Sequence, residues 1–220
     1  MAALLPIEQE IIEEMLARRP DLAGCVPSLE ALHHSLVAAY DGGRQLFICG
    51  NGGSNADAMH IAGELCKSFE RKRIVPERVK EALRGLPFGN ELAGNLEAGL
   101  PAIALGFNGS LKTAVENDIP LRDIAFAQEL FALGKAGDVV VGISTSGNAS
   151  NCLMALSVAK AIGATPVSLT GPNGGKMAAF ADIAIKAPGT CTKVIQEAHL
   201  VLYHTFSAMI EAHYFPERRC

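Results

Sequence analysis

A histidine and a glutamate four residues apart, His60 and Glu64, carry the clearest chemical signal in the sequence. In a helix this spacing places both side chains on one face, so that an imidazole nitrogen and a carboxylate oxygen can reach the same point. Such a pair suits zinc or a similar divalent cation, and it also suits acid–base chemistry. An ordinary ion pair on a helix surface has the same spacing, so the pair by itself leaves these interpretations open.

Polar residues in or just before a strongly apolar C-terminal helix offer further ligands, because polar groups in such a helix need partners. The candidates are Gln196, Glu197, His199 and His204. Gln196 and His199 share a helical face, whereas Gln196 and His204 are about 80° apart around the helix. Helical angles therefore do not show which of these residues would join His60 and Glu64 as ligands. The remaining histidines have no partner in the sequence and are interpreted as structural: His33, His34 and His213.

Two loops rich in glycine and hydroxyl groups each follow an apolar strand. In the second loop, Ser144, Thr145 and Ser146 supply hydroxyls, and Gly147 allows the turn that leads into a helix. A helix N-terminus favours negative charge, so this loop suits a phosphate monoester, although such residues also serve as ordinary helix caps. The first loop, 50–54, has the same character, although it fits neither a dinucleotide fingerprint nor a Walker loop, and two such loops in one sheet favour a phosphosugar ligand.

Short apolar strands alternate with helical patterns from residue 45 onward. Strands are expected at 45–50, 101–106, 138–144, 165–171 and 182–187. Strands that are apolar throughout are typical of a parallel sheet covered on both faces, so residues 45–220 are predicted to form one doubly wound α/β domain of about five strands. Residues 1–44 are predicted to form an N-terminal helical extension that contributes an oligomer contact. Ligands bind beyond the carboxyl ends of such strands, which points to the loops 50–55, 106–110 and 144–150.

Composition narrows the class of protein. The chain is 49% hydrophobic and 19% charged, with a mean hydropathy of +0.23, which is apolar for a monomer and favours an oligomer. A net charge of −4 argues against nucleic acid as a partner. Six scattered cysteines predict mostly buried thiols in a reducing compartment. Without a signal peptide or an apolar run of about 18 residues, the protein is predicted to be cytoplasmic and not to enter a membrane.

The motifs taken together resemble the sugar isomerase (SIS) family, and within it the phosphoheptose isomerase branch. In chain order they are GNGGSNADAMHIAGEL, LPAIAL, END, GDVVVGISTSGN, SLTGPNGGKMAAFADIAI and VIQEAHL. The resemblance implies a flavodoxin-like sheet and a homotetramer with active sites at subunit interfaces. It also implies conversion of D-sedoheptulose 7-phosphate to D-glycero-D-manno-heptose 7-phosphate through an enediol(ate), in the supply of heptose for lipopolysaccharide.

The resemblance also assigns residues. It implies one zinc ion per subunit, held by His60, Glu64, Gln196 and His204, and so prefers His204 to His199. Glu64 would be the catalytic base and His204 the catalytic acid. Substrate contacts would come from Asn51, Gly52, Gly53, Ser54, Glu64, Asn117, Asp118 and Gln196, and the phosphate would lie on Ser144, Thr145 and Ser146.

The sequence departs from the family pattern at three places. Ala149 stands where the family has a serine that contacts phosphate, and Ser68 stands where it usually has an arginine. Residues 74–98 are predicted to be an insertion that acts as a lid, a binding loop or an oligomer contact. Because of these differences, isomerisation of another ketose phosphate remains an alternative function. A non-catalytic SIS adaptor that binds a replication initiator protein is a second alternative, although an adaptor has no use for the His/Glu/Gln/His set.

Overall fold

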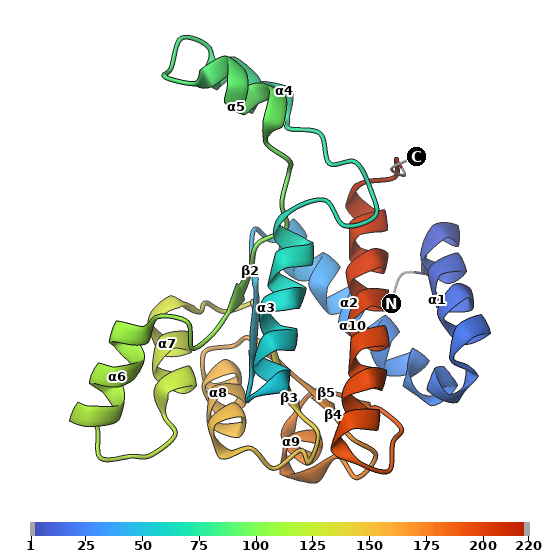
Figure 1. Ribbon diagram of the computed structural model, residues 1–220, viewed down its shortest axis with the longest axis vertical. Coiled ribbons are helices and arrows are strands. Elements are labelled where there is room, and N and C mark those ends of the chain that lie inside the picture. Colours follow the sequence, from blue (N-terminus) through green and yellow to red (C-terminus); the bar gives the residue numbers. More distant parts are fainter. Residues whose placement is uncertain (1–2, 218–220) are drawn as a thin grey trace.

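Five parallel strands form the sheet of the protein, in the order β2-β1-β3-β4-β5, as seen in a computed structural model that describes residues 3–217 (Figure 1). The strands are β1 Leu46–Gly50, β2 Ala102–Ala104, β3 Val139–Ser144, β4 Thr165–Thr170 and β5 Ile183–Lys186. Each neighbouring pair is parallel. This is the flavodoxin-like strand order, so the predicted doubly wound α/β fold is confirmed.

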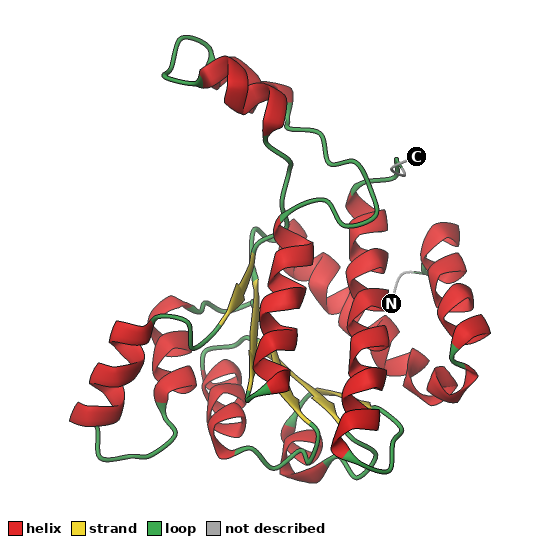
Figure 2. Ribbon diagram, viewed as in Figure 1, coloured by secondary structure: helices red, strands yellow, loops and turns green. Residues whose placement is uncertain are grey.

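Helices connect the strands and cover both faces of the sheet (Figure 2). Two of them precede β1, as predicted: α1 Pro6–Arg18 and α2 Val26–Asp41, with the short 3-10 helix Pro20–Cys25 between them. The others are α3 Gly53–Cys66, α4 Glu77–Leu83, α5 Gly89–Asn95, α6 Gly109–Asp118, α7 Ala125–Leu133, α8 Ser150–Ala161, α9 Gly175–Phe180 and α10 Thr192–Tyr214. An oligomer contact made by the N-terminal helices stays a prediction.

Alternate side chains of the strands fill two separate hydrophobic cores. Leu46 and Ile48 of β1 pack with residues of α1, α2, α3 and α10 on one face of the sheet. Phe47 and Cys49 pack with residues of α7, α8 and α9 on the other face. Burial on both faces explains why the strands are continuous apolar runs in the sequence.

Helices α3 and α10 lie side by side and run in the same direction (Figure 1). The amide of Gln196 packs on Gly53 at the start of α3, and the hydroxyl of Tyr203 lies 2.9 Å from Nδ1 of His60. Seven residues separate the two contacts on each helix, so the helices keep the same register from the carboxyl edge of the sheet upward. This pairing decides which polar residues of α10 can meet those of α3.

Residues 74–98 project from the domain as an arm that carries α4 and α5 (Figure 1). The amide of Ala98 donates to the carbonyl of Arg73 at 3.2 Å, so both ends of the arm meet at its root. Phe88 at the turn between the helices is 75% exposed. Helix α4 falls on the amphipathic pattern of residues 76–86, which predicts a helix, whereas α5 lies in the glycine-rich half, where the sequence predicts none. The interpretation of the arm as an insertion stays a prediction.

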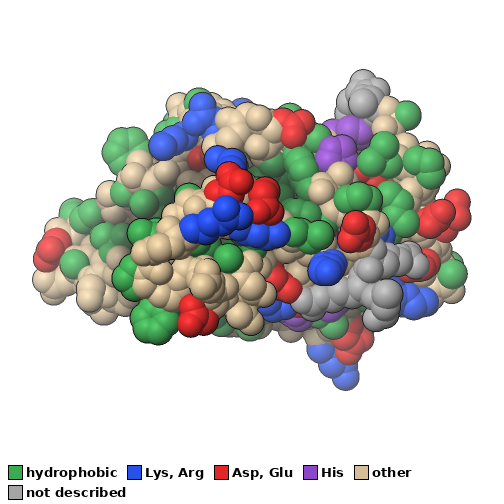
Figure 3. Space-filling model, turned by 90° about the horizontal axis from the view of Figure 1, so that it is seen from above, with side chains coloured by type: hydrophobic (Ala, Val, Ile, Leu, Met, Phe, Trp, Pro, Cys, Tyr) green, Lys and Arg blue, Asp and Glu red, His purple; other side chains and the backbone are tan. Residues whose placement is uncertain are grey.

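The described residues also bear on the predictions from composition. Within residues 3–217, no helix combines the length and the hydropathy that a membrane span requires. The cysteines described there are free thiols, and Cys25, Cys49 and Cys152 are buried; Cys220 lies outside the described residues. On the face shown in Figure 3, Lys and Arg side chains lie among Asp and Glu side chains, in keeping with the small net charge.

Candidate active site

His60, Glu64 and His204 come together where α3 and α10 face each other. Their ligand atoms all lie within 4.8 Å of one another, and Nε2 of His60 is 3.0 Å from Oε1 of Glu64. The ring centroids of His60 and His204 are 5.0 Å apart. Two imidazoles and one carboxylate at this separation form a donor set that zinc commonly takes in proteins.

Tyr203 sets the orientation of the His60 ring. Its hydroxyl lies 2.9 Å from Nδ1 of His60 and donates to Oδ1 of Asp57 at 3.3 Å. Burial raises the pKa of Tyr203 and also the pKa of Asp57, so Tyr203 keeps its proton. With that proton directed at Asp57, the hydroxyl can accept from Nδ1–H of His60, and Nε2 of His60 is then the nitrogen that lies 3.0 Å from Oε1 of Glu64. In this tautomer Nε2 of His60 and Oε1 of Glu64 can bind the same cation.

His204 brings a neutral imidazole to the cluster. Burial lowers the pKa of His204, and the neighbouring His60 lowers it further. Its Nε2 is buried and has no hydrogen-bond partner among the described residues. His199, the alternative in the sequence, is fully buried, and its Nε2 lies 3.0 Å from the carbonyl oxygen of Thr170. The structure therefore brings His204 and not His199 to His60 and Glu64.

Gln196 lies at the other end of the α3–α10 pair. Its amide nitrogen occupies the space that a Cβ on Gly53 would fill. Eight residues separate Gln196 from His204, which is about 12 Å along a helix axis at 1.5 Å per residue. Within one chain Gln196 is therefore beside the first glycine loop, and the four predicted metal ligands do not all meet.

A cleft of about 320 Å³ opens at the carboxyl edge of the sheet, where the strand order reverses beside β1. Such a switch point is where doubly wound sheets bind ligands. Of the predicted substrate residues, Asn51 and Gly52 line it, and the Asn51 amide is paired with that of Asn151 at 2.8–2.9 Å. Ser54 is buried and packs against Gly50 at the start of α3. The cleft is lined by Gly50, Asn51, Gly52, Asn55, Gly106, Lys112, Glu116, Asp123, Ala125, Phe126 and Asn151.

The charged residues of this cleft were missed from the sequence, because they come from α6 and from the loop before α7. Lys112 and Glu116 are one helical turn apart and 3.9 Å from each other. Asp123 has a positive φ of 66° and accepts a hydrogen bond from the Ser150 hydroxyl at 2.7 Å. A non-glycine residue with positive φ often marks a functional turn, but this conformation is not visible in the sequence.

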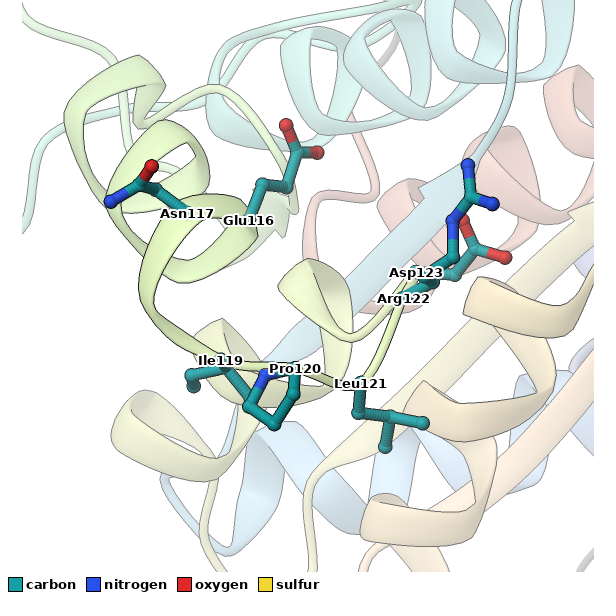
Figure 4. Close-up of a pocket in the computed structure, with 7 residues that line it drawn as sticks. All are labelled: Glu116, Asn117, Ile119, Pro120, Leu121, Arg122 and Asp123. Carbon is teal, nitrogen blue, oxygen red and sulfur yellow. The ribbon is translucent and has the colours of Figure 1, made fainter.

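Asn117 and Asp118 end α6, and the structure does not bring them to the His–Glu–His cluster. The Asn117 amide donates to Asp118 at 2.9 Å, and both residues are exposed. Asn117 lines a hollow of about 450 Å³ beside the cleft, opposite Arg122 (Figure 4). Glu116 and Asp123 line both the hollow and the cleft. A substrate contact by Asn117 or Asp118 stays a prediction.

The loop 144–150 joins β3 to α8 at the same edge of the sheet. Ser144 is 8% exposed, and its hydroxyl lies 3.4 Å from that of Ser146, which accepts from the amide of Asn148. Gly147 has a φ of +65°, and the carbonyl of Gly174 leaves no room for a Cβ. Helix α8 begins after Ala149 without a side-chain cap. The amide of Cys152 donates to Oδ1 of Asn151 at 2.9 Å, which leaves the amides of Ser150 and Asn151 at the helix N-terminus to face an anion.

A second group of histidines lies between the N-terminal helices and α10. Oε1 of the buried Glu8 is 3.1 Å from Nε2 of His33 and 2.8 Å from Nδ1 of His213. Burial lowers the pKa of His33. The sequence offered these histidines no partner, because Glu8 is far from both along the chain. The distances are those of hydrogen bonds to a shared carboxylate, which fits the structural role predicted for both histidines.

Comparison with known proteins supports the resemblance. Models of the SIS domain match residues 121–210 and 25–84. The phosphoheptose isomerase of Aneurinibacillus thermoaerophilus is 38% identical over 183 residues, which are 83% of this chain and 80% of that protein. The phosphoheptose isomerase of Synechocystis sp. is 35% identical over 212 residues, which are 96% of this chain and 95% of that protein.

Solved structures agree with the sequence relatives. The phosphoheptose isomerase of Neisseria gonorrhoeae is 30% identical, covers 90% of this chain and 94% of its own, and has a TM-score of 0.68. That of Francisella tularensis is 26% identical, covers 93% and 95%, and has a TM-score of 0.71. The chain therefore belongs to the phosphoheptose isomerase family of SIS-domain proteins.

Proposed function

We propose that the protein is an aldose–ketose isomerase that converts D-sedoheptulose 7-phosphate to D-glycero-D-manno-heptose 7-phosphate. The observation that carries the proposal is the cluster of His60, Glu64 and His204, formed by two helices that begin at the ligand-binding edge of the sheet. Relatives that match nearly the whole chain bear the name phosphoheptose isomerase. An adaptor that only binds another protein would not need the cluster.

Zinc is the proposed cofactor, one ion per subunit. The unpartnered Nε2 of His204 and the facing pair of His60 and Glu64 fit a cation bound by two nitrogens and one oxygen. Gln196 is about 12 Å from His204 along α10, so it would act as a ligand only from a second copy of the chain. This supports the proposal of a homotetramer with active sites at subunit interfaces.

The substrate would span the carboxyl edge of the sheet. Its phosphate would lie on Ser144, Thr145 and Ser146 at the N-terminus of α8, where helix amides favour an anion. Its sugar hydroxyls would contact the cleft at Asn51 and Gly52, and a polar cleft of this kind suits a heptose chain. Glu64 lies eleven residues beyond Gly53 on α3, which is about 16 Å along the helix axis, so the loops that meet a given His60–Glu64–His204 cluster would come from a second copy of the chain.

Isomerisation then requires proton transfers at neighbouring carbons. Glu64 removes the proton from C1 of the ketose, and the electron pair moves to give an enediolate. His204 acts as the acid that moves a proton between the two substrate oxygens, and return of a proton to C2 gives the aldose. A bound zinc ion would polarise the carbonyl and stabilise the negative charge of the enediolate.

Metal content and variant enzymes test this assignment. Purified protein should contain about one zinc ion per chain, and Glu64→Gln and His204→Ala should each abolish turnover while the oligomer persists. Glu197→Gln is the matched control, because Glu197 is an exposed residue of the same helix and its loss should leave turnover unchanged. Full activity in both Glu64→Gln and His204→Ala would show that the roles of these residues are wrong.

A further inference from the structure

A buried ion pair ties together the two helices that carry the proposed metal ligands. The side chains of Arg73 and Glu211 are fully buried, and Nε of Arg73 lies 2.7 Å from Oε1 of Glu211. Glu211 follows His204 on α10 by seven residues, which is about two helical turns on the same face. The pair therefore lies against the same side of α10 as His204.

The remaining N–H groups of Arg73 cap the C-terminal end of α3 by donating to its last carbonyl oxygens. Nη2 donates to the carbonyl oxygen of Glu64 at 2.9 Å, and Nη1 donates to the carbonyl oxygen of Leu65. Carbonyls in the last turn of a helix have no partner within the helix, and a cation is favoured there by the helix dipole. Arg73 therefore holds the main chain of Glu64, whose side chain is the proposed base and ligand.

Glu211 acts on the other half of the cluster. Its carboxylate accepts the amide N–H of Phe69 and that of Glu70, each at 2.8 Å. The ring of Phe69 packs against the imidazole of His204, with centroids 5.5 Å apart. Together with Arg73, these donors satisfy the buried carboxylate through charge-assisted hydrogen bonds. Glu211 thus fixes the position of Phe69, whose ring packs against the imidazole of His204.

We propose that Arg73 and Glu211 are positioning residues for the metal site. They hold the main chain of Glu64 and the packing of His204, so that the cluster stays within reach of a single ion. This inference rests on the proposed function and adds the two residues that hold α3 and α10 in fixed positions relative to each other. Residues that hydrogen-bond to the side chains of metal ligands change metal affinity about 10- to 100-fold, and we expect an effect of that order from these main-chain contacts.

Arg73→Lys separates positioning from charge. Lysine keeps a cation opposite Glu211, but an ammonium lacks the planar fork that reaches the carbonyls of Glu64 and Leu65 at once. We expect the dissociation constant for Zn²⁺, measured by competition with a chromophoric chelator, to rise about 10- to 100-fold. The visible spectrum of the Co²⁺-substituted protein should shift, and kcat should fall with little change in KM.

Asp138→Asn is the matched control. Asp138 is a buried carboxylate just before β3 that accepts the amides of Gln45 and Lys135, neither of which belongs to α3 or α10. Its replacement should lower Tm while the Zn²⁺ dissociation constant and the Co²⁺ spectrum stay as in the wild type. This separates a general loss of stability from a change at the metal site.

Glu211→Gln provides a second variant if Arg73→Lys does not fold, because the amide still offers one acceptor to Arg73. It should weaken Zn²⁺ binding in the same direction. A variant that lowers Tm but binds Zn²⁺ with wild-type affinity and an unchanged Co²⁺ spectrum would overturn the proposal. Failure of the wild-type protein to bind Zn²⁺ or to isomerise its substrate would instead contradict the proposed function, so the two failures are distinguishable.

Discussion

Replacement of Tyr203 by phenylalanine tests whether the support of His60 matters to the metal site. Tyr203 is 1% exposed, and phenylalanine has nearly the same shape, so the change removes one hydroxyl and little else. His60 then loses its partner at Nδ1, and its ring is free to carry the proton on Nε2 instead. Loss of such a partner lowers metal affinity about 10- to 100-fold, or ~1.4–2.8 kcal/mol of binding free energy.

The same change has a separate effect on stability. Asp57 is partly buried and loses the hydroxyl that donates to it, so the free energy of unfolding should fall by about 1–3 kcal/mol. Tyr214→Phe is the matched control on the same helix, because the Tyr214 hydroxyl contacts Val37 at 3.1 Å and Asp41 at 2.9 Å. The control should lose similar stability without any loss of metal affinity.

Two measurements separate these effects. Competition titration with a chromophoric chelator gives the Zn²⁺ affinity of each variant at fixed pH, and urea unfolding of the metal-free protein gives its stability. The reasoning predicts weaker Zn²⁺ binding for Tyr203→Phe alone. Equal Zn²⁺ affinity in Tyr203→Phe, Tyr214→Phe and the wild type would refute the claim that Tyr203 orients His60.

Three further predictions concern phosphate, pH and the arm. Ser146→Ala should mainly raise KM for the sugar phosphate in steady-state assays, because a phosphate contact acts equally in the ground and transition states; an unchanged KM would place the phosphate elsewhere. Burial lowers the pKa of His33 and of His199, so both are neutral when folded and bind protons more readily when unfolded. The free energy of unfolding should therefore fall as the pH drops below about 6.5, and urea titrations from pH 7.5 to 5 that show constant stability would contradict this. Replacement of residues 76–95 by a short glycine–serine linker should leave Tm within a few degrees, because the ends of the arm meet at Arg73 and Ala98; a large fall in Tm would show that the arm supports the fold.

The fold was predictable because its signals are local. Continuous apolar strands separated by helical patterns require a covered parallel sheet, and both glycine loops fall at its carboxyl edge. The meeting of His60 and Glu64 follows from their spacing alone. Helix α5 was missed, because two glycines in seven residues argue against a helix, yet α5 packs against α4 within the arm.

Long-range placement was not predictable from the residues. Which of His199 and His204 faces His60 depends on how α10 lies against α3, and only the family resemblance indicated His204 before the structure placed it there. The same register places Gln196 beside Gly53 at the start of α3, away from the other predicted ligands, His60, Glu64 and His204. Arg73 and Glu211 are 138 residues apart, and neither has a local feature that indicates the other.

The central claim is tested most directly by supplying D-sedoheptulose 7-phosphate to the purified protein in deuterated water and following the products by NMR. The account predicts formation of D-glycero-D-manno-heptose 7-phosphate with deuterium from solvent at C2, loss of this activity after chelation, and its return with Zn²⁺. It also predicts no product with Glu64→Gln. No conversion of this or any other ketose phosphate by the metal-loaded wild-type protein would contradict the account.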